Sequence, residues 1–360
     1  MYPYYKVFLD AQSHMDVVWY LDEHRHGYYR REQIGQGLVD FCELDLSEYA
    51  DKLKELTAIP LISSSYDKLR NMIFDVAELI KGKHSYIYFF LIGALNNTVL
   101  EPVYQGDLED GKLKQLRQCR LLLDGVLQLQ ETFQYGLHFC LDKDNLTERS
   151  AAERMTGFFF EFPTFGTFTI LTGFSVGPEK NGRLDFDRVE EMNQENITDT
   201  REVLGALHAD QSKVSLLPYY RVEDMESILY LEFMEMLRRG IYVRKCALCG
   251  RYFILTDKRR REFCSREYRD GKTCREIGPL LRYEKALTED SYLQKFETAY
   301  NRIYSRYYRA DGKTEAECSG KDMTKEEFMA WSRAASKAKA DYQKGLISGE
   351  EMMRIVVTVC

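Results

Sequence analysis

Four of the nine cysteines in this chain lie within one stretch of 29 residues, CALCGRYFILTDKRRREFCSREYRDGKTC. Cys246 and Cys249 form a C-x2-C pair that Gly250 follows. Cys264 and Cys274 come after gaps of 14 and 9 residues. Two thiolates separated by two residues can bind one metal ion from a tight turn, and the glycine adopts backbone angles that other residues avoid. The pattern predicts a zinc knuckle.

Four cysteine sulfurs favour zinc over harder cations. All positions of a tetrahedral zinc ion are then filled by protein, so the ion is structural and is not a Lewis acid for catalysis. An iron–sulfur cluster is the competing occupant. Zinc is preferred because the stretch is polar and its spacings fit neither ferredoxin pattern. We therefore predict structural Zn2+ bound by Cys246, Cys249, Cys264 and Cys274, of which Cys274 follows the least regular gap.

The rest of the chain has the composition of a soluble globular protein. Hydrophobic residues make up 44% and charged residues 30% of its 360 residues, enough for two or three domains. The other five cysteines stand singly, which is typical of a reducing compartment. The N-terminus lacks the basic start and apolar run of a secretory signal. We therefore expect a cytoplasmic protein.

The longest strongly apolar run extends from Tyr86 to Leu95. It has about half of the roughly 20 residues that a helix needs to cross a bilayer. We therefore expect no membrane association. The run is predicted to be either a buried strand or a core helix.

Hydrophobic periodicity predicts a mainly α fold with a small β component. Residues 1–80 are expected to be mostly helical. Apolar residues recur on one face of 114–141, which indicates a long amphipathic helix. Further helices are predicted at 187–209, 222–239 and 284–309, and after the capping-box patterns that begin at Thr324 and Ser348.

The β component is expected in two places. Residues 156–176 are rich in Phe, Thr and Gly, which favours one or two short strands. Tyr252–Leu255 is predicted to be a strand that leaves the knuckle, with a return strand at 261–264. The predicted organisation is therefore a helical N-terminal domain at 1–240, a zinc-knuckle module at 241–285 and C-terminal helices at 286–360.

The run from Met234 to Arg282 contains a helix, the pattern I-x-V-x-K-C-x-x-C-G-R-Y-F, a basic segment, F-C-S and a last cysteine before another helix. It resembles a family of uncharacterised bacterial proteins with a C-terminal four-cysteine zinc-finger region. It is more distantly similar to the CGNR zinc-finger proteins, where the last cysteine begins a Cys-Gly-Asn-Arg quartet. Here Cys274-Arg275-Glu276-Ile277 stands in that place. The resemblance implies a helical N-terminal domain and a DNA-binding finger of a transcription regulator.

Positive charge is concentrated in the cysteine region. Residues 244–285 contain 13 bases and 6 acids, a net charge of +7, whereas residues 1–243 contain 25 bases and 39 acids, a net charge of -14. Zinc with four thiolates has a charge of about -2, which two of the surplus bases can neutralise. The remaining surplus suits contact with a phosphate backbone. The predicted nucleic-acid-binding residues are Lys258, Arg259, Arg260, Arg261, Arg266, Arg269 and Lys272.

These observations predict a DNA- or RNA-binding protein, with a role in transcription regulation, that uses a basic zinc module. The alternative is a protein–protein adaptor that uses the same module, because a basic loop can also dock on an acidic protein surface. No nucleophile–base pair and no phosphate-binding glycine loop is recognisable in the sequence. We therefore expect a non-enzymatic role with no catalytic residues.

Overall fold

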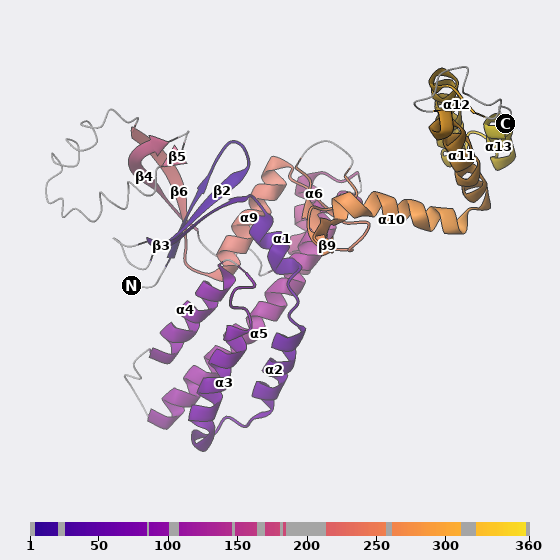
Figure 1. The fold of residues 1–360 in the computed structure, drawn as a ribbon. Coiled ribbons are helices and arrows are strands. Elements are labelled where there is room, and N and C mark those ends of the chain that lie inside the picture. The colour runs from indigo at the N-terminus through magenta and orange to yellow at the C-terminus, as the bar shows by residue number, and fades with distance from the viewer. Residues whose placement is uncertain are drawn as a thin grey trace. The chain divides into compact units, whose positions relative to one another are not determined.

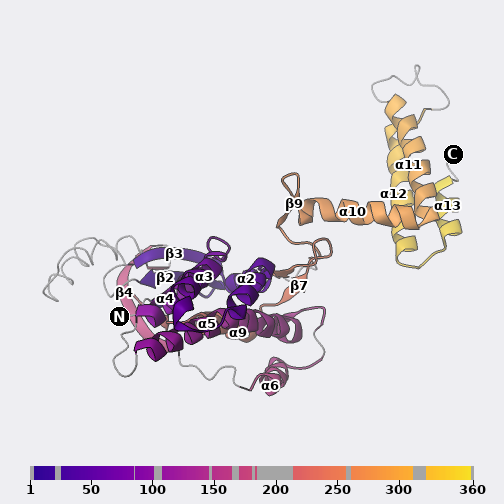
Figure 2. The same ribbon diagram turned by 90° about the horizontal axis from the view of Figure 1, so that it is seen from below.

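The computed structural model confirms a mainly α fold with small β-sheets (Figures 1 and 2). It describes residues 4–20, 26–84, 86–100, 108–145, 148–163, 170–180, 183–184, 214–256, 261–310 and 322–357. The backbone divides into two compact units. Unit 1 is Met1–Cys246 with Gly250–Glu262, and unit 2 is Ala247–Cys249 with Phe263–Cys360. The three-part division into 1–240, 241–285 and 286–360 stays a prediction.

Unit 1 contains an antiparallel sheet with the strand order β3-β2-β1-β6-β4-β5. Its strands are β1 (Tyr4–Leu9), β2 (His14–Tyr20), β3 (His26–Gln33), β4 (Leu171–Lys180), β5 (Arg183–Leu184) and β6 (Val214–Val222). The mostly helical prediction for residues 1–80 is therefore wrong at its start. The chain there has the period of two that strands require, because Tyr5 and Val7 face the main core whereas Tyr4 and Phe8 belong to a separate apolar cluster.

The helices of unit 1 pack with the sheet around one hydrophobic core (Figure 1). They are α1 (Gln36–Cys42), α2 (Ser47–Ala58), the 3-10 helix η1 (Ser63–Ser65), α3 (Tyr66–Glu78), α4 (Ile87–Leu100), α5 (Leu108–Gly136), the π-helical turn η2 (Leu137–Leu141), α6 (Ala151–Glu161) and α9 (Met225–Arg239). The predicted helix at 114–141 is confirmed as α5 and η2. The apolar run at Tyr86–Leu95 lies mostly in α4, so the core-helix alternative is confirmed.

Two further predictions in unit 1 have mixed outcomes. The helix predicted at 222–239 is confirmed from Met225, and it ends as expected at Gly240, whose φ of 65° is left-handed. The strands predicted for 156–176 are wrong up to residue 161, because the capping box of Ser150 and Glu153 begins α6 there. The strand β4 begins only at Leu171. The helix predicted at 187–209 lies outside the described residues.

The start of α1 is stabilised by a side chain from α9. Its N-cap residue, Gly35, has no side chain that can accept from the first turn. The buried carboxyl of Glu232 accepts instead from the Leu38 N–H at 3.1 Å and from the Tyr86 hydroxyl. Burial, together with the charge of Glu32, raises the pKa of Glu232 well above its ordinary value. A residue 194 positions away thus supplies the helix cap.

Unit 2 has a separate core formed by its last three helices. Its elements are β9 (Glu267–Arg269), β10 (Lys272–Thr273), α10 (Cys274–Glu289), α11 (Ser291–Ala310), α12 (Lys325–Gln343) and α13 (Gly349–Val357). Trp331 is buried in this core and donates its indole N–H to the Val356 carbonyl at 3.1 Å. The capping boxes that begin at Thr324 and Ser348 are both confirmed.

The single helix predicted at 284–309 is wrong, because α10 ends at Glu289 and α11 begins at Ser291. Asp290 has extended backbone angles, and its carboxylate accepts from the backbone N–H groups of Tyr292 and Leu293 at 2.8 and 3.1 Å. These contacts give α11 its N-cap. In the described part of the chain, no helix is long and apolar enough to cross a membrane.

His84 is a buried titratable group that connects α1 and α4. Its Nε2 lies 2.8 Å from the Gly37 carbonyl and its Nδ1 lies 3.4 Å from the Ile87 backbone N–H. These partners suit a neutral ring with the proton on Nε2. Burial lowers the pKa of His84 from 6.5 to about 4.

This lowered pKa predicts a loss of stability in mild acid. Between pH 6.5 and about 4 the unfolded chain binds a proton at His84 that the folded chain does not, so the free energy of unfolding falls as the pH falls. The loss attributable to His84 is about 3 kcal/mol. Urea unfolding of the wild type and of His84→Gln across this pH range measures the effect. The free energy of unfolding of His84→Gln should decline less than that of the wild type as the pH falls. Parallel pH profiles would contradict the assignment.

Candidate metal centre

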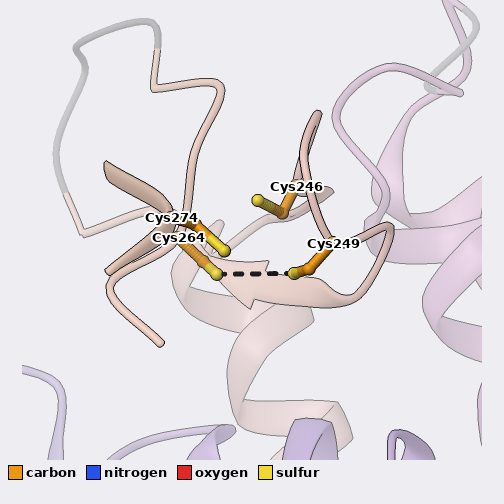
Figure 3. Close-up of side chains that lie close together, drawn as sticks. All are labelled: Cys246, Cys249, Cys264 and Cys274. Carbon is orange, nitrogen blue, oxygen red and sulfur yellow. Dashed lines mark hydrogen bonds between the residues drawn. The ribbon is translucent and has the colours of Figure 1, made fainter. Parts of the chain in front are cut away.

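The structure brings the sulfurs of Cys246, Cys249, Cys264 and Cys274 within 4.8 Å of one another (Figure 3). The Cys249 and Cys264 sulfurs are 3.7 Å apart, far beyond the roughly 2.05 Å of a disulfide bond. Zinc–sulfur bonds of about 2.3 Å in a tetrahedron place neighbouring sulfurs about 3.8 Å apart. The four cysteines can therefore hold a metal ion.

The first two cysteines lie on a tight turn of the kind expected for a knuckle. The Gly250 N–H donates to the Cys246 carbonyl at 2.9 Å, and the Cys246 N–H donates to the Arg251 carbonyl at 2.9 Å. Gly250 has a φ of 73°, which is unfavourable for residues with a Cβ. The glycine after the C-x2-C pair thus allows the backbone to reverse beside the sulfurs.

The knuckle lies at the end of a two-stranded sheet formed by β7 (Val243–Lys245) and β8 (Tyr252–Ile254). The strand predicted at Tyr252–Leu255 is thus confirmed. The return strand predicted at 261–264 is wrong, because no strand is present there and β8 pairs with β7, which precedes the knuckle. Val243, Tyr252 and Ile254 are buried in the unit 1 core, and this burial selects the pairing.

Three acidic side chains of unit 1 fix this small sheet. Glu43 accepts from the Tyr252 N–H at 2.7 Å, and Asp142 accepts from the Tyr252 hydroxyl at 3.2 Å. Asp144 binds the guanidinium of Arg244 through two hydrogen bonds of 2.8 Å. The sequence analysis missed all three, because Glu43 lies 209 residues from its partner and no local pattern distinguishes these acids from the other acids of the chain.

Cys264 is positioned by packing of its neighbour Phe263 against α10, and Cys274 by the start of that helix. The ring of Phe263, next to Cys264, lies over Gly278, where an added Cβ would be 2.3 Å from the ring. Cys274 is the first residue of α10, and its N–H donates to the Arg266 carbonyl at 2.9 Å. A capping box between Thr273 and Glu276 fixes the start of the helix. Both cysteines are buried.

A β-hairpin, β9–β10, lies in the chain between these two cysteines. Its turn is Asp270-Gly271, with φ angles of 55° and 71°. An Asp-Gly pair between two short strands is a recognised hairpin signal that the sequence analysis did not use. The strand residues of β9 are all exposed, including Tyr268 at 43%.

The structure separates the seven predicted nucleic-acid-binding residues into three groups. Lys258, Arg259 and Arg260 lie outside the described residues. Arg261 and Arg266 are half-buried, and the Arg261 carbonyl accepts from the Arg244 guanidinium at 2.8 Å. Arg269 and Lys272 are exposed on the β9–β10 hairpin.

Comparison with known protein families gives a partial match. A model described as "Family of unknown function (DUF6076)" matches residues 194–343, a range that includes all four clustered cysteines. No curated protein and no solved structure matches the chain. The expected likeness to the CGNR zinc-finger proteins stays a prediction.

Zinc content after purification tests the metal centre. The wild type should retain about one zinc ion per chain after dialysis, and Cys246→Ser should retain far less because only three thiolates remain. Cys119→Ala is the matched control, since Cys119 is buried in the unit 1 core away from the cluster. Metal analysis checks these contents. A wild-type chain without bound metal, or equal loss in the control, would contradict the assignment.

Gly278→Ala should weaken metal binding although Gly278 is not a ligand. The new Cβ would displace the Phe263 ring and with it the neighbouring Cys264. Loss of such a supporting contact typically lowers metal affinity about 10- to 100-fold. Competition with a chromophoric chelator measures this change. Leu280→Ala, at a 56% exposed position of the same helix, should leave the affinity unchanged.

Proposed function

We propose that this protein binds nucleic acid through a structural zinc module, with phosphate contacts made by the β9–β10 hairpin. The observation that supports this most strongly is the hairpin's place in the chain, between the third and fourth cysteines of the cluster. A metal ion held at both ends of this segment would make the hairpin a rigid recognition element. Zinc is the proposed ion because four cysteine sulfurs suit its tetrahedral geometry.

The exposed side chains of the hairpin suit a phosphate backbone. Arg269 and Lys272 present positive charge to solvent, and Tyr268 adds an aromatic face that can stack on a base. Arg269 lies 3.8 Å from the Asp270 carboxylate, but both side chains are more than half exposed. A pair of this kind contributes about 1 kcal/mol or less, so Arg269 remains able to exchange its partner for a phosphate.

The same geometry favours binding over catalysis at this centre. Four sulfurs fill a tetrahedral zinc ion and leave no position for a substrate or a water molecule. We therefore propose a non-enzymatic role for the module. The sequence resemblance to CGNR zinc-finger proteins makes transcription regulation the first role to test.

A charge-matched pair of variants tests the nucleic-acid proposal. Arg269→Gln/Lys272→Gln should weaken binding to duplex DNA and reduce the slope of log K against log salt by about 1.8, since each lost phosphate contact removes about 0.9. Arg333→Gln/Lys337→Gln removes the same charge from exposed positions of α12 and should leave the slope unchanged. Fluorescence anisotropy over a salt series measures both.

The same titrations with single-stranded RNA show which of the two nucleic acids binds more tightly. The change in slope caused by the double variant should be smaller with RNA, because the slope per phosphate is smaller for single strands. Absence of binding to DNA and RNA at low salt would overturn the proposal. It would favour the protein–protein adaptor, which uses the same exposed hairpin.

A further inference from the structure

Unit 1 contains a cavity of about 550 Å³ at a distance in sequence from the cysteine module. Its walls come from α4, α5, the residue Phe162 after α6, and the start of α9, with Tyr5 of β1. A volume of this size lies within the range of small-molecule binding sites. None of its lining residues belongs to the metal centre.

The cavity is lined by a glycine from each of its two long helices, Gly93 on α4 and Gly125 on α5. A Cβ added at Gly125 would have no atom within 4 Å, so the space beside it is open. Glycine within a helix costs about 0.5–1 kcal/mol relative to alanine. The two glycines therefore lower the stability of their helices and leave the space beside them unfilled. That space is large enough for a ligand.

One wall of the cavity is acidic. Glu223, Asp224 and Glu226 all line it at the beginning of α9. Asp224 is occupied as the N-cap, since it accepts from the N–H and the hydroxyl of Ser227 at 2.7 and 2.8 Å. Glu223 binds Arg221 at 2.8 Å. Two of the three carboxylates therefore already have partners within the protein.

Glu226 differs from its neighbours because it forms no ion pair within the described part of the chain. Its side chain is half-buried in the cavity wall. Burial, together with the nearby charge of Asp224, raises the pKa of Glu226 above its ordinary value. A cation in the cavity would relieve this unfavourable placement of a carboxylate.

Most of the remaining lining residues are aromatic or apolar, with Asn97, Gln128 and Thr132 as the polar exceptions. The rings of Tyr5, Phe89, Phe90 and Phe162 line the cavity, and the centroids of Tyr5 and Phe90 are 4.4 Å apart. Aromatic faces attract cations, and they also bury the apolar part of a ligand. An anion would meet three carboxylates here. The chemistry of the cavity therefore selects positive charge attached to an apolar body.

We propose that this cavity binds a small organic ammonium ion, whose charged head lies at Glu226 and whose apolar or aromatic body lies between α4 and α5. The proposal does not depend on the nucleic-acid role of the cysteine module. It assigns unit 1 a ligand-binding function of its own.

Three probes with one shape and different charge test the proposal. They are 2-(1-naphthyl)ethylamine, the neutral alcohol 2-(1-naphthyl)ethanol, and the anion 1-naphthylacetate. The ammonium probe should bind at least about tenfold more tightly than the alcohol, which corresponds to one favourable ion contact of about 1.4 kcal/mol. The acetate probe should bind most weakly. Isothermal titration calorimetry on the full chain measures all three affinities.

Two variants separate charge recognition from cavity volume. Glu226→Gln should remove the preference for the ammonium probe and leave the affinity for the alcohol. Gly125→Leu should abolish binding of all three, because the new side chain would occupy the cavity. Glu131→Gln, at an exposed position of α5 outside the cavity wall, is the matched control and should change nothing.

Equal affinities for the three probes, or binding that survives in Gly125→Leu, would overturn the proposal. Thermal unfolding of each variant confirms that it is folded, and Gly125→Leu is expected to be no less stable than the wild type. The zinc content and the salt slope of nucleic-acid binding should be unaffected in both cavity variants. Failure of this proposal is therefore distinguishable from failure of the zinc-module proposal.

Discussion

The convergence of four cysteine sulfurs is the interaction on which the middle of this chain depends. Between residues 261 and 273, Cys264 is the one buried residue, and the β9–β10 hairpin has no apolar core of its own. A short segment of this kind rarely folds by hydrophobic burial alone. A structural zinc ion contributes on the order of 10 kcal/mol in comparable small modules. Four cysteines that can hold a metal ion therefore lie where this segment lacks an apolar core.

Residues next to the cluster that are not ligands hold the four cysteines in position. Gly250 allows the knuckle to turn, Gly278 allows Phe263 to approach α10, and Thr273 caps the helix at Cys274. None of these residues offers a ligand. Gly250 and Thr273 shape the backbone beside a cysteine, and Gly278 makes room for the ring next to Cys264. Rigid placement of ligands lowers the cost of binding a metal ion.

Unit 1 uses buried polar contacts for a similar purpose. Glu232 caps α1 from α9, and His84 bonds α1 to the start of α4. Buried groups of this kind are costly when unpaired, so they favour one arrangement of the helices over others. The cavity between α4 and α5 is the contrasting feature, because there the packing is left open beside Gly125.

Features encoded by neighbouring residues could be predicted from the sequence. The C-x2-C-Gly turn, the capping boxes at Thr324 and Ser348, and the end of α9 at Gly240 each depend on contacts within a few residues. The periodicity of α5 is equally local. For these elements the chemistry of a short segment selects its conformation, so the four-cysteine set and these helices were accessible in advance.

Only the tertiary structure decided which distant segments meet. The strand β1 pairs with β6, more than 200 residues later, β8 turns back onto β7, and Asp144 holds Arg244 across 100 positions. Strand pairing and ion pairs between distant residues leave no local pattern, because their energy comes from burial and partners supplied by the whole fold. The cavity at Glu226 is of the same kind, since its walls come from elements that are adjacent only after folding.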